Sequence, residues 1–121
     1  MTKALGQHML IDYFDCDSLS LRDTKVLEAA FKAAILEVGG TIVTSIFHTF
    51  SPYGISGIVV ISESHVALHT WPEKNIASVD IFSCSSKLDL DQLAVLIKKI
   101  LKSGYHNQRL FERGIHFSNC A

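Results

Sequence analysis

The sequence has no apolar run long enough to cross a membrane and no excess of charge of either sign. No stretch approaches the ~20 consecutive apolar residues of a spanning helix, and the N-terminal MTKALGQHML lacks the apolar segment of a signal peptide. The formal net charge of −1 offers no electrostatic footprint for nucleic acid or for an anionic membrane. These absences predict a protein that acts on neither nucleic acid nor membranes.

Cysteine is also scarce, because the chain has only Cys16, Cys84 and Cys120. An odd number of widely spaced cysteines argues against a disulfide framework and against a Cys-x-x-Cys metal site. Repeats, low-complexity segments and linkers are absent as well. We therefore expect one cytoplasmic domain over residues 1–121, long enough and apolar enough, at 48% hydrophobic residues, to bury a single core.

Two segments have the apolar spacing of amphipathic helices. In residues 21–38 apolar side chains recur every three or four positions, Ser20 with Asp23 resembles a capping box, and Gly39-Gly40 is typical of a left-handed C-terminal cap. The second helix is predicted over residues 89–102, with Gly104 at its end.

The remaining segments have the composition of strands. Strands are expected at residues 7–13, 41–49, within 59–71 and at 76–84, with a last short one at 107–112, whereas the tail after Gly114 carries little pattern. The order is strand, helix, three strands, helix, strand, and the short connections favour antiparallel pairing. The predicted fold is an α+β two-layer sandwich, an antiparallel sheet with two helices on one face.

Residues 65–71 and 76–84 can pair as a hairpin around residues 72–75. The register that places Trp71 opposite Ile76 also places Cys84 across from Glu63 and Ser64, and it keeps apolar side chains together on the face toward the helices. The other face is the candidate site, and it collects these reactive side chains: Ser64, His65, His69, Trp71 and Cys84.

Several interpretations of this face compete. His65-x-x-x-His69 would suit zinc on a helix, but on a strand the two side chains lie about 13 Å apart, too far for one metal. Ser64, His69 and Asp80 have the residue types of a hydrolase triad, although no Gly-x-Ser-x-Gly elbow presents the serine. The third interpretation is a binding module with a solvated sheet face and no catalysis.

A long motif resolves these alternatives by resemblance. The stretches HTFSPYGISGIVVISESHVALHTWPE and ASVDIFSC resemble the S-adenosylmethionine decarboxylases in their short bacterial and archaeal form, and the likeness runs from about Gly6 to Gly114. The family makes a proenzyme, or zymogen, that cuts itself before a serine. The resemblance implies cleavage between Glu63 and Ser64 into residues 1–63 and 64–121, with no metal. It also implies a pyruvoyl group, derived from Ser64, that forms a Schiff base with the substrate.

The resemblance also implies a role for each site residue. His69 would accept the α-proton during processing, Ser56 would assist the cleavage, and Cys84 would donate a proton to the substrate carbon after carbon dioxide leaves. Phe50 and Trp71 would hold the adenosyl group of the substrate. Glu73 would accept hydrogen bonds from the ribose hydroxyls, a role that suits a carboxylate.

Two departures from the family pattern leave the substrate open. Lys74-Asn75-Ile76 replaces the usual aromatic-glycine-aromatic turn, and Ser85-Ser86 replaces the usual glycine after the cysteine. The resemblance implies decarboxylation of S-adenosylmethionine for spermidine and polyamine synthesis. The alternatives are a pyruvoyl-dependent arginine or ornithine decarboxylase, and a non-catalytic or hydrolytic domain. The expected partners are a small-molecule substrate and a second copy of the chain, as a homodimer of cleaved protomers.

Overall fold

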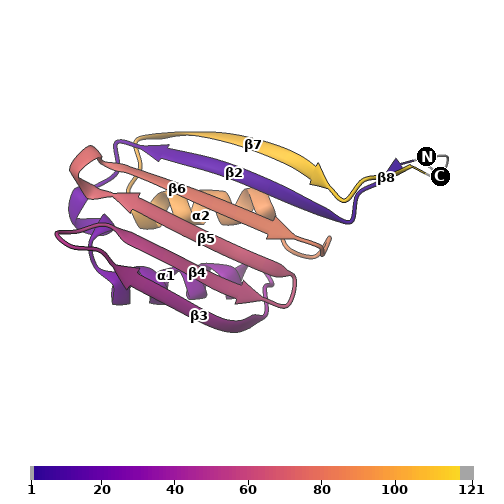
Figure 1. Cartoon of the computed structure of the whole chain (residues 1–121), viewed down its shortest axis with the longest axis horizontal. Coiled ribbons are helices and arrows are strands. Elements are labelled where there is room, and N and C mark those ends of the chain that lie inside the picture. The colour runs from indigo at the N-terminus through magenta and orange to yellow at the C-terminus, as the bar shows by residue number, and fades with distance from the viewer. Residues whose placement is uncertain (1, 118–121) are drawn as a thin grey trace.

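The computed structural model describes residues 2–117, and Cys120 lies outside them. A six-stranded antiparallel sheet has the strand order β3-β4-β5-β6-β2-β7, and two helices pack on one of its faces (Figure 1). Its strands are β2 (Gly6–Phe14), β3 (Ile42–Thr49), β4 (Ile55–Ile61), β5 (Ser64–Trp71), β6 (Ile76–Ser83) and β7 (Tyr105–Arg113). The predicted α+β sandwich is confirmed.

The first helix is shorter than predicted. Helix α1 (Thr24–Glu37) starts after Asp23, whose carboxylate accepts hydrogen bonds from the backbone N–H groups of Lys25 and Val26. Residues 18–21 form a separate 3₁₀ turn instead (η1, Ser18–Leu21). The predicted start at residue 21 was therefore wrong, because Asp23 is itself the N-cap. At the other end Gly39 has a φ of +92°, as predicted for the cap.

The second helix has close to its predicted bounds, and the difference lies in the residue that caps its C-terminus. Asp89 caps α2 (Leu90–Leu101) by accepting a hydrogen bond from the backbone N–H of Gln92. The left-handed residue at its C-terminus is Lys102, with a φ of +50°, two positions before the predicted Gly104. Within residues 2–117, no helix has the length and apolar character needed to cross a membrane.

The segment 59–71 is two strands rather than one. Strands β4 and β5 form a hairpin in which Ile61 pairs with Ser64, so that Ser62 and Glu63 make the turn. The predicted order was therefore short by one strand, since no glycine or proline marks the break between β4 and β5. At 72–74 a short 3₁₀ turn (η2, Pro72–Lys74) links β5 to β6.

The tail also has more structure than its sequence indicates. Strand β7 runs over Tyr105–Arg113, longer than the predicted 107–112, and pairs with β2 along its whole length. Beyond it, β8 (His116–Phe117) pairs with β1 (Thr2–Lys3) as a separate two-stranded ribbon.

The hydrophobic core lies between the sheet and the helices. Alternate side chains of the central strands point into it, and they meet one stripe from each helix. Its largest fully buried members are Tyr13, Phe31, Met9, Ile11, Leu21, Leu27, Ile35, Ile55, Leu68, Ile81, Leu93 and Ile97. Because the helices cover only one face, the opposite face of the sheet is left open, and we refer to it below as the open face.

Candidate active site

The predicted hairpin register is confirmed. Trp71 pairs with Ile76, and Ser64 pairs with Ser83, which places Cys84 next to the start of β5. The burial pattern alternates along both strands, so that Val66 and Leu68 lie in the core. His65, His69 and Trp71 therefore lie on the open face, as predicted. Ser64 opens β5 with the parity of Val66 and Leu68 and pairs with the buried Ser83, so the prediction that it shares this face was wrong.

Ser64 and Cys84 come together at the end of the sheet where β5 begins and β6 ends. The Ser64 Oγ lies 3.9 Å from the Cys84 Sγ, and the Cys84 backbone N–H donates a 2.9 Å hydrogen bond to the carbonyl oxygen of Glu63. The Glu63 carboxylate accepts a second hydrogen bond, from the Thr41 backbone N–H, at 3.0 Å. The bond predicted to be cut is thus flanked by a hydroxyl, a thiol and a backbone donor.

A hollow of about 340 Å³ adjoins this end. It is lined by Cys84 and by Ser85 and Ser86, the two serines that depart from the family pattern. Ser83 accepts a hydrogen bond from the backbone N–H of Ser85 at 3.1 Å and donates one to its carbonyl at 3.0 Å. The departure at 85–86 therefore lies beside the thiol rather than in the core.

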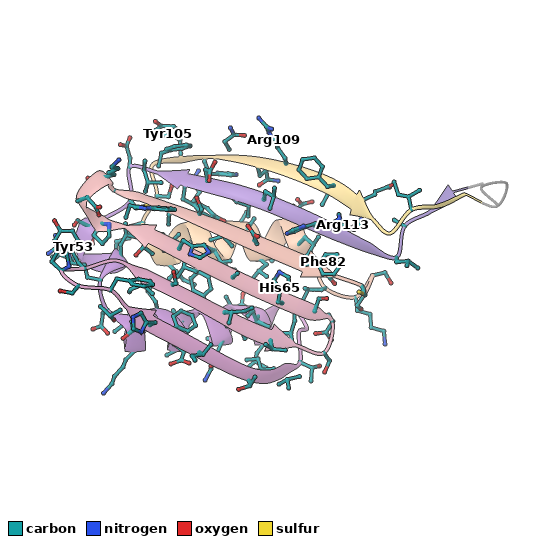
Figure 2. The ribbon with its side chains drawn as sticks, viewed as in Figure 1. Tyr53, His65, Phe82, Tyr105, Arg109 and Arg113 are labelled. Carbon is teal, nitrogen blue, oxygen red and sulfur yellow. The ribbon has the colours of Figure 1, made fainter. Side chains whose placement is uncertain are left out.

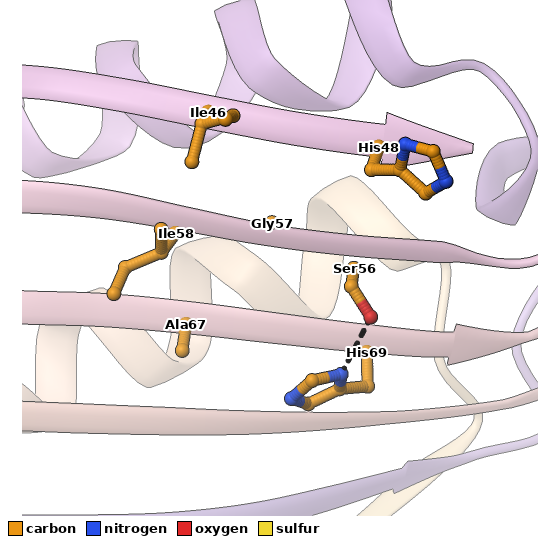
Figure 3. A pocket seen from close by; sticks show the side chains of 7 residues that line it. All are labelled: Ile46, His48, Ser56, Gly57, Ile58, Ala67 and His69. Carbon is orange, nitrogen blue, oxygen red and sulfur yellow. Dashed lines mark hydrogen bonds between the residues drawn. The ribbon is translucent and has the colours of Figure 1, made fainter. Parts of the chain in front are cut away.

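The other end of the open face holds Ser56 and His69. The Ser56 Oγ lies 2.9 Å from the His69 Nδ1, a hydrogen bond between neighbouring strands β4 and β5 (Figure 3). The two side chains border a largely apolar hollow of about 320 Å³, which is also lined by Ile46, Ile58 and Ala67. The serine thus orients the imidazole at the edge of an apolar surface.

The predicted substrate-binding residues gather around a second hollow at the same end. Phe50, Trp71 and Glu73 line a space of about 230 Å³ together with Ser56 and His69. The two aromatic rings are 50% and 41% exposed, so each has a face free for a ligand. A planar group and a polar group could therefore both be held there.

The two ends are well separated within one chain. Ser64 and His69 are five positions apart on β5, which at about 3.3 Å per residue is about 16 Å. The pairing of Ser64 with Ile61, and of His69 with Ser56, shows the same separation on the neighbouring strand. Within one chain, neither the proposed base nor a Ser64/His69/Asp80 triad can reach Ser64.

A cluster between the two ends was missed by the sequence reasoning. His65, Phe82 and His8 lie side by side across three strands, and His65 and Phe82 are marked in Figure 2. Burial, followed by the charge of His8, lowers the pKa of His65 below its usual range, whereas Asp80 acts in the opposite direction. The Arg113 guanidinium lies 2.9 Å from the His8 Nδ1. The alternating pattern of residues 7–13, which includes His8, was visible in the sequence. Which side chains lie beside His8 depends on the order of the strands in the sheet, which the sequence did not show.

The comparisons with known proteins identify the family of the chain. A profile of the family described as S-adenosylmethionine decarboxylase matches residues 7–114. The chain is 44% identical over 112 residues to the S-adenosylmethionine decarboxylase proenzyme of Thermotoga petrophila, across 93% of this chain and 86% of that protein. Identity to the proenzyme of Fervidobacterium nodosum is 48% over 101 residues, across 84% and 74% of the two chains.

Solved structures show the same fold. The crystal structure of the adenosylmethionine decarboxylase from Aquifex aeolicus matches with a TM-score of 0.85 at 27% identity, covering 98% of both chains. A Trypanosoma brucei AdoMetDC structure matches with a TM-score of 0.64 at 10% identity, over 86% of this chain and 45% of that one, and shows the fold alone. Since the profile covers most of the chain and close relatives share 44–48% of its residues, the chain belongs to the S-adenosylmethionine decarboxylase family.

Proposed function

We propose that this chain cuts itself between Glu63 and Ser64 and that the matured protein decarboxylates S-adenosylmethionine. The observation that carries the proposal is the grouping of the Ser64 hydroxyl, the Cys84 thiol and the hydrogen-bonded carbonyl of Glu63 at one turn. The relatives from Thermotoga petrophila and Fervidobacterium nodosum are named proenzymes of this activity. The product would supply aminopropyl groups for spermidine synthesis.

Self-cleavage starts at the Glu63 carbonyl. The Ser64 Oγ attacks the carbonyl carbon, and the peptide bond breaks as an ester forms and the Ser64 amine is freed. The Cys84 N–H, 2.9 Å from the carbonyl oxygen, stabilises the negative charge that develops on that oxygen. Loss of the residue 64 α-proton then expels the Glu63 carboxylate, and the dehydroalanine left at position 64 hydrolyses to a pyruvoyl group and ammonia.

The residues at this end suit a pyruvoyl group. Residue 64 opens β5, and the thiol of Cys84, a residue that lines a hollow, lies beside it. When formed, the group supplies the electron-accepting carbonyl that no ordinary side chain offers. We assign the Cys84 thiol as the donor that protonates the substrate carbon after carbon dioxide leaves, because its sulfur lies 3.9 Å from the Ser64 oxygen.

The base that removes the α-proton must come from a second chain. His69 lies about 16 Å along its own strand from Ser64, far beyond hydrogen-bond reach. We propose a homodimer in which two open faces pack together about a two-fold axis across the strands. The axis reverses the direction of the strands in one protomer relative to the other. His69 and Ser56 of one protomer would therefore lie over Ser64 and Cys84 of the other.

The open face has the character of a surface that packs against protein. It exposes apolar side chains along its whole width, among them Leu10, Ile46, Trp71 and Phe111. Polar groups are interspersed, such as Ser78, which donates a hydrogen bond to Asp12 at 2.7 Å. A wide, uncovered apolar face of this kind is unusual for a monomer and supports the dimer.

The same packing would complete a substrate site. Phe50, Trp71 and Glu73 lie at the His69 end, so they would meet the pyruvoyl end of the partner chain. The aromatic rings would hold the adenine, and the Glu73 carboxylate would accept hydrogen bonds from the ribose hydroxyls.

Cleavage is tested by intact mass. Purified protein is expected to contain two chains, residues 1–63 and residues 64–121, the second with a blocked N-terminus. Ser64→Ala is expected to fold and to remain one chain. Wild-type protein that stays uncut after prolonged incubation would overturn the proposal and favour a non-catalytic domain.

The dimer is tested by mixing two inactive variants. Ser64→Ala and His69→Ala are each expected to stay uncut, yet co-expression forms mixed dimers with one intact combination of Ser64 and His69. In those dimers only the His69→Ala chain should be cut. Failure of the mixture to cut, although mixed dimers form, would refute a shared site.

The substrate is tested by competition. Matured enzyme is offered S-adenosylmethionine, arginine and ornithine at equal concentration, and the amine products are identified. Decarboxylated S-adenosylmethionine is expected. Agmatine or putrescine as the main product would refute the nucleoside assignment and leave the cleavage mechanism standing.

A further inference from the structure

The turn that carries the scissile bond lacks the backbone conformation that tight hairpins favour. Only Ser62 and Glu63 join β4 to β5. Turns of this length match the twist of their strands when their central residues have positive φ, which glycine and asparagine supply. Ser62 and Glu63, both within the described residues, have no positive φ, and the positive value of +158° falls on Ser64. The turn therefore depends on contacts from outside the hairpin.

Those contacts come from Thr41. Its backbone N–H donates a 3.0 Å hydrogen bond to the Glu63 carboxylate, and its carbonyl accepts a 2.8 Å hydrogen bond from the Ser62 N–H. The Glu63 carbonyl is held from the other side by the Cys84 N–H. The carboxylate and the carbonyl of Glu63 are thus each held by a backbone N–H group, from Thr41 and Cys84 respectively.

Thr41 is itself held rigidly by the end of α1. Gly39 adopts a left-handed φ of +92°, and the Gly40 N–H donates a 2.8 Å hydrogen bond to the carbonyl of Ile35, which is fully buried. A Cβ at Gly40 would collide with the Ile35 side chain, so the chain can pass there only as glycine. This Gly-Gly cap therefore fixes Thr41 with respect to the core.

We infer that the Glu63 carboxylate is a positioning group for self-cleavage, which uses Thr41 as a fixed anchor to hold its own carbonyl toward the Ser64 hydroxyl and the Cys84 N–H. The inference rests on the proposed function, since it concerns the same cleavage. It gives the Glu63 side chain a part in the reaction, beyond being the residue that precedes the cut.

A purely structural contact would behave differently. The hydrogen bond between Thr41 and Glu63 is exposed to solvent, so its loss costs little global stability. If it only supported the hairpin, its removal would lower the melting temperature slightly and leave the cleavage rate unchanged. If it positions the carbonyl, the cleavage rate falls while the melting temperature hardly changes.

The test follows cleavage in full-length chains made by cell-free synthesis. Newly labelled precursor is chased, and its split into residues 1–63 and 64–121 is timed on a gel. Glu63→Ala is expected to slow the cut roughly tenfold, the cost of losing one charge-assisted hydrogen bond in a solvated turn. Glu63→Gln keeps an acceptor oxygen and should recover to within about threefold of wild type. Glu37→Gln, an exposed glutamate at the end of α1, is the matched control.

The anchor itself is tested at the backbone. Thr41→Pro removes the N–H donor, and its rate is compared with Thr41→Ala, which keeps that donor. The cleavage rate of Thr41→Pro should be lower than that of Thr41→Ala. The ratio of these two rates should be about the same as the ratio between Glu63→Ala and wild type. The double variant Thr41→Pro/Glu63→Ala should be no slower than the slower single variant, because both remove one contact. Circular dichroism confirms that each variant folds.

Two results would overturn the inference. The first is Glu63→Ala cutting as fast as wild type, and the second is additive losses in the double variant. Either would leave the proposed function intact as long as wild-type chains are cut. By contrast, an uncut wild type would remove the proposed function itself, so the two failures are distinguishable.

Discussion

Cys84 contributes to the site twice, and the substitution Cys84→Ala separates the two contributions. Its backbone N–H is 2.9 Å from the Glu63 carbonyl oxygen, whereas its thiol sulfur is 3.9 Å from the Ser64 hydroxyl oxygen. Alanine keeps the first group and removes the second. We therefore expect Cys84→Ala to mature, because the donor that stabilises the cleavage oxyanion is still present.

Turnover of the matured variant should nevertheless be poor. A side chain that transfers a proton in the transition state typically contributes about 10²–10⁴-fold. At about 1.4 kcal/mol per tenfold, this corresponds to roughly 3–5 kcal/mol of barrier. Because the thiol belongs to an exposed residue at the rim of a hollow, water can replace it in part, and we expect a loss near 10²-fold.

The assay releases labelled carbon dioxide from carboxyl-labelled S-adenosylmethionine. Rates are divided by the fraction of cut chain, measured by intact mass, so that slow maturation is not mistaken for slow catalysis. Cys84→Ser, which keeps a hydroxyl of weaker acidity in the same place, is the comparison variant and should lie between alanine and wild type. Turnover of Cys84→Ala within threefold of wild type would refute the assignment of Cys84 as the acid.

Three further predictions follow from individual side chains. Phe50→Ala should raise KM for S-adenosylmethionine more than Phe50→Tyr does, since tyrosine keeps a stacking face. Equal KM values in the two variants would show that the ring of Phe50 does not contact the substrate. Thr70→Val should lower the free energy of unfolding by about 2–3 kcal/mol in urea titrations, because the buried Thr70 hydroxyl donates to the Leu21 carbonyl and accepts from the Ile55 N–H, each at 3.0 Å. Because the pKa of His65 is lowered in the folded chain, the unfolded chain protonates this imidazole at a higher pH than the folded chain does. The free energy of unfolding should therefore fall as the pH drops below about 6.5, and it should depend less on pH in His65→Phe. An unchanged slope would contradict the burial of this imidazole.

Much of the fold could be predicted because its signals are local. The Gly39 cap and the apolar stripes mark the helices, and two-residue alternation in β5 and β6 specified the register and the face that His65, His69 and Trp71 share. The break at Ser62-Glu63 could not be predicted, since the turn contains no glycine, asparagine or proline. Its conformation depends on Thr41, 22 residues away, a contact that only the tertiary structure reveals.

The roles of the site residues were predicted by resemblance, and the hairpin register predicted that Cys84 lies across from Ser64, but the rest of the grouping was not predicted. The prediction that Ser64 and His69 share one face was wrong, because an odd spacing of five residues places them on opposite faces of a strand, and the same spacing separates them by about 16 Å along it. The strand order added that Ser56 on β4 lies beside His69 on β5.

This division into two ends has a consequence for how the protein would mature. If the base lies on a second chain, a monomer holds an intact scissile turn and cannot finish the cut, since no imidazole reaches the residue 64 α-proton. Ester formation needs only Ser64 and the Cys84 N–H, whereas ester breakdown needs the partner's His69. Diluted precursor should therefore accumulate ester, which hydroxylamine cleaves, and its maturation rate should rise with chain concentration until the dimer is saturated. A cleavage rate independent of concentration, in chains shown to be monomeric, would require a base within the same chain and contradict the separation that the structure shows.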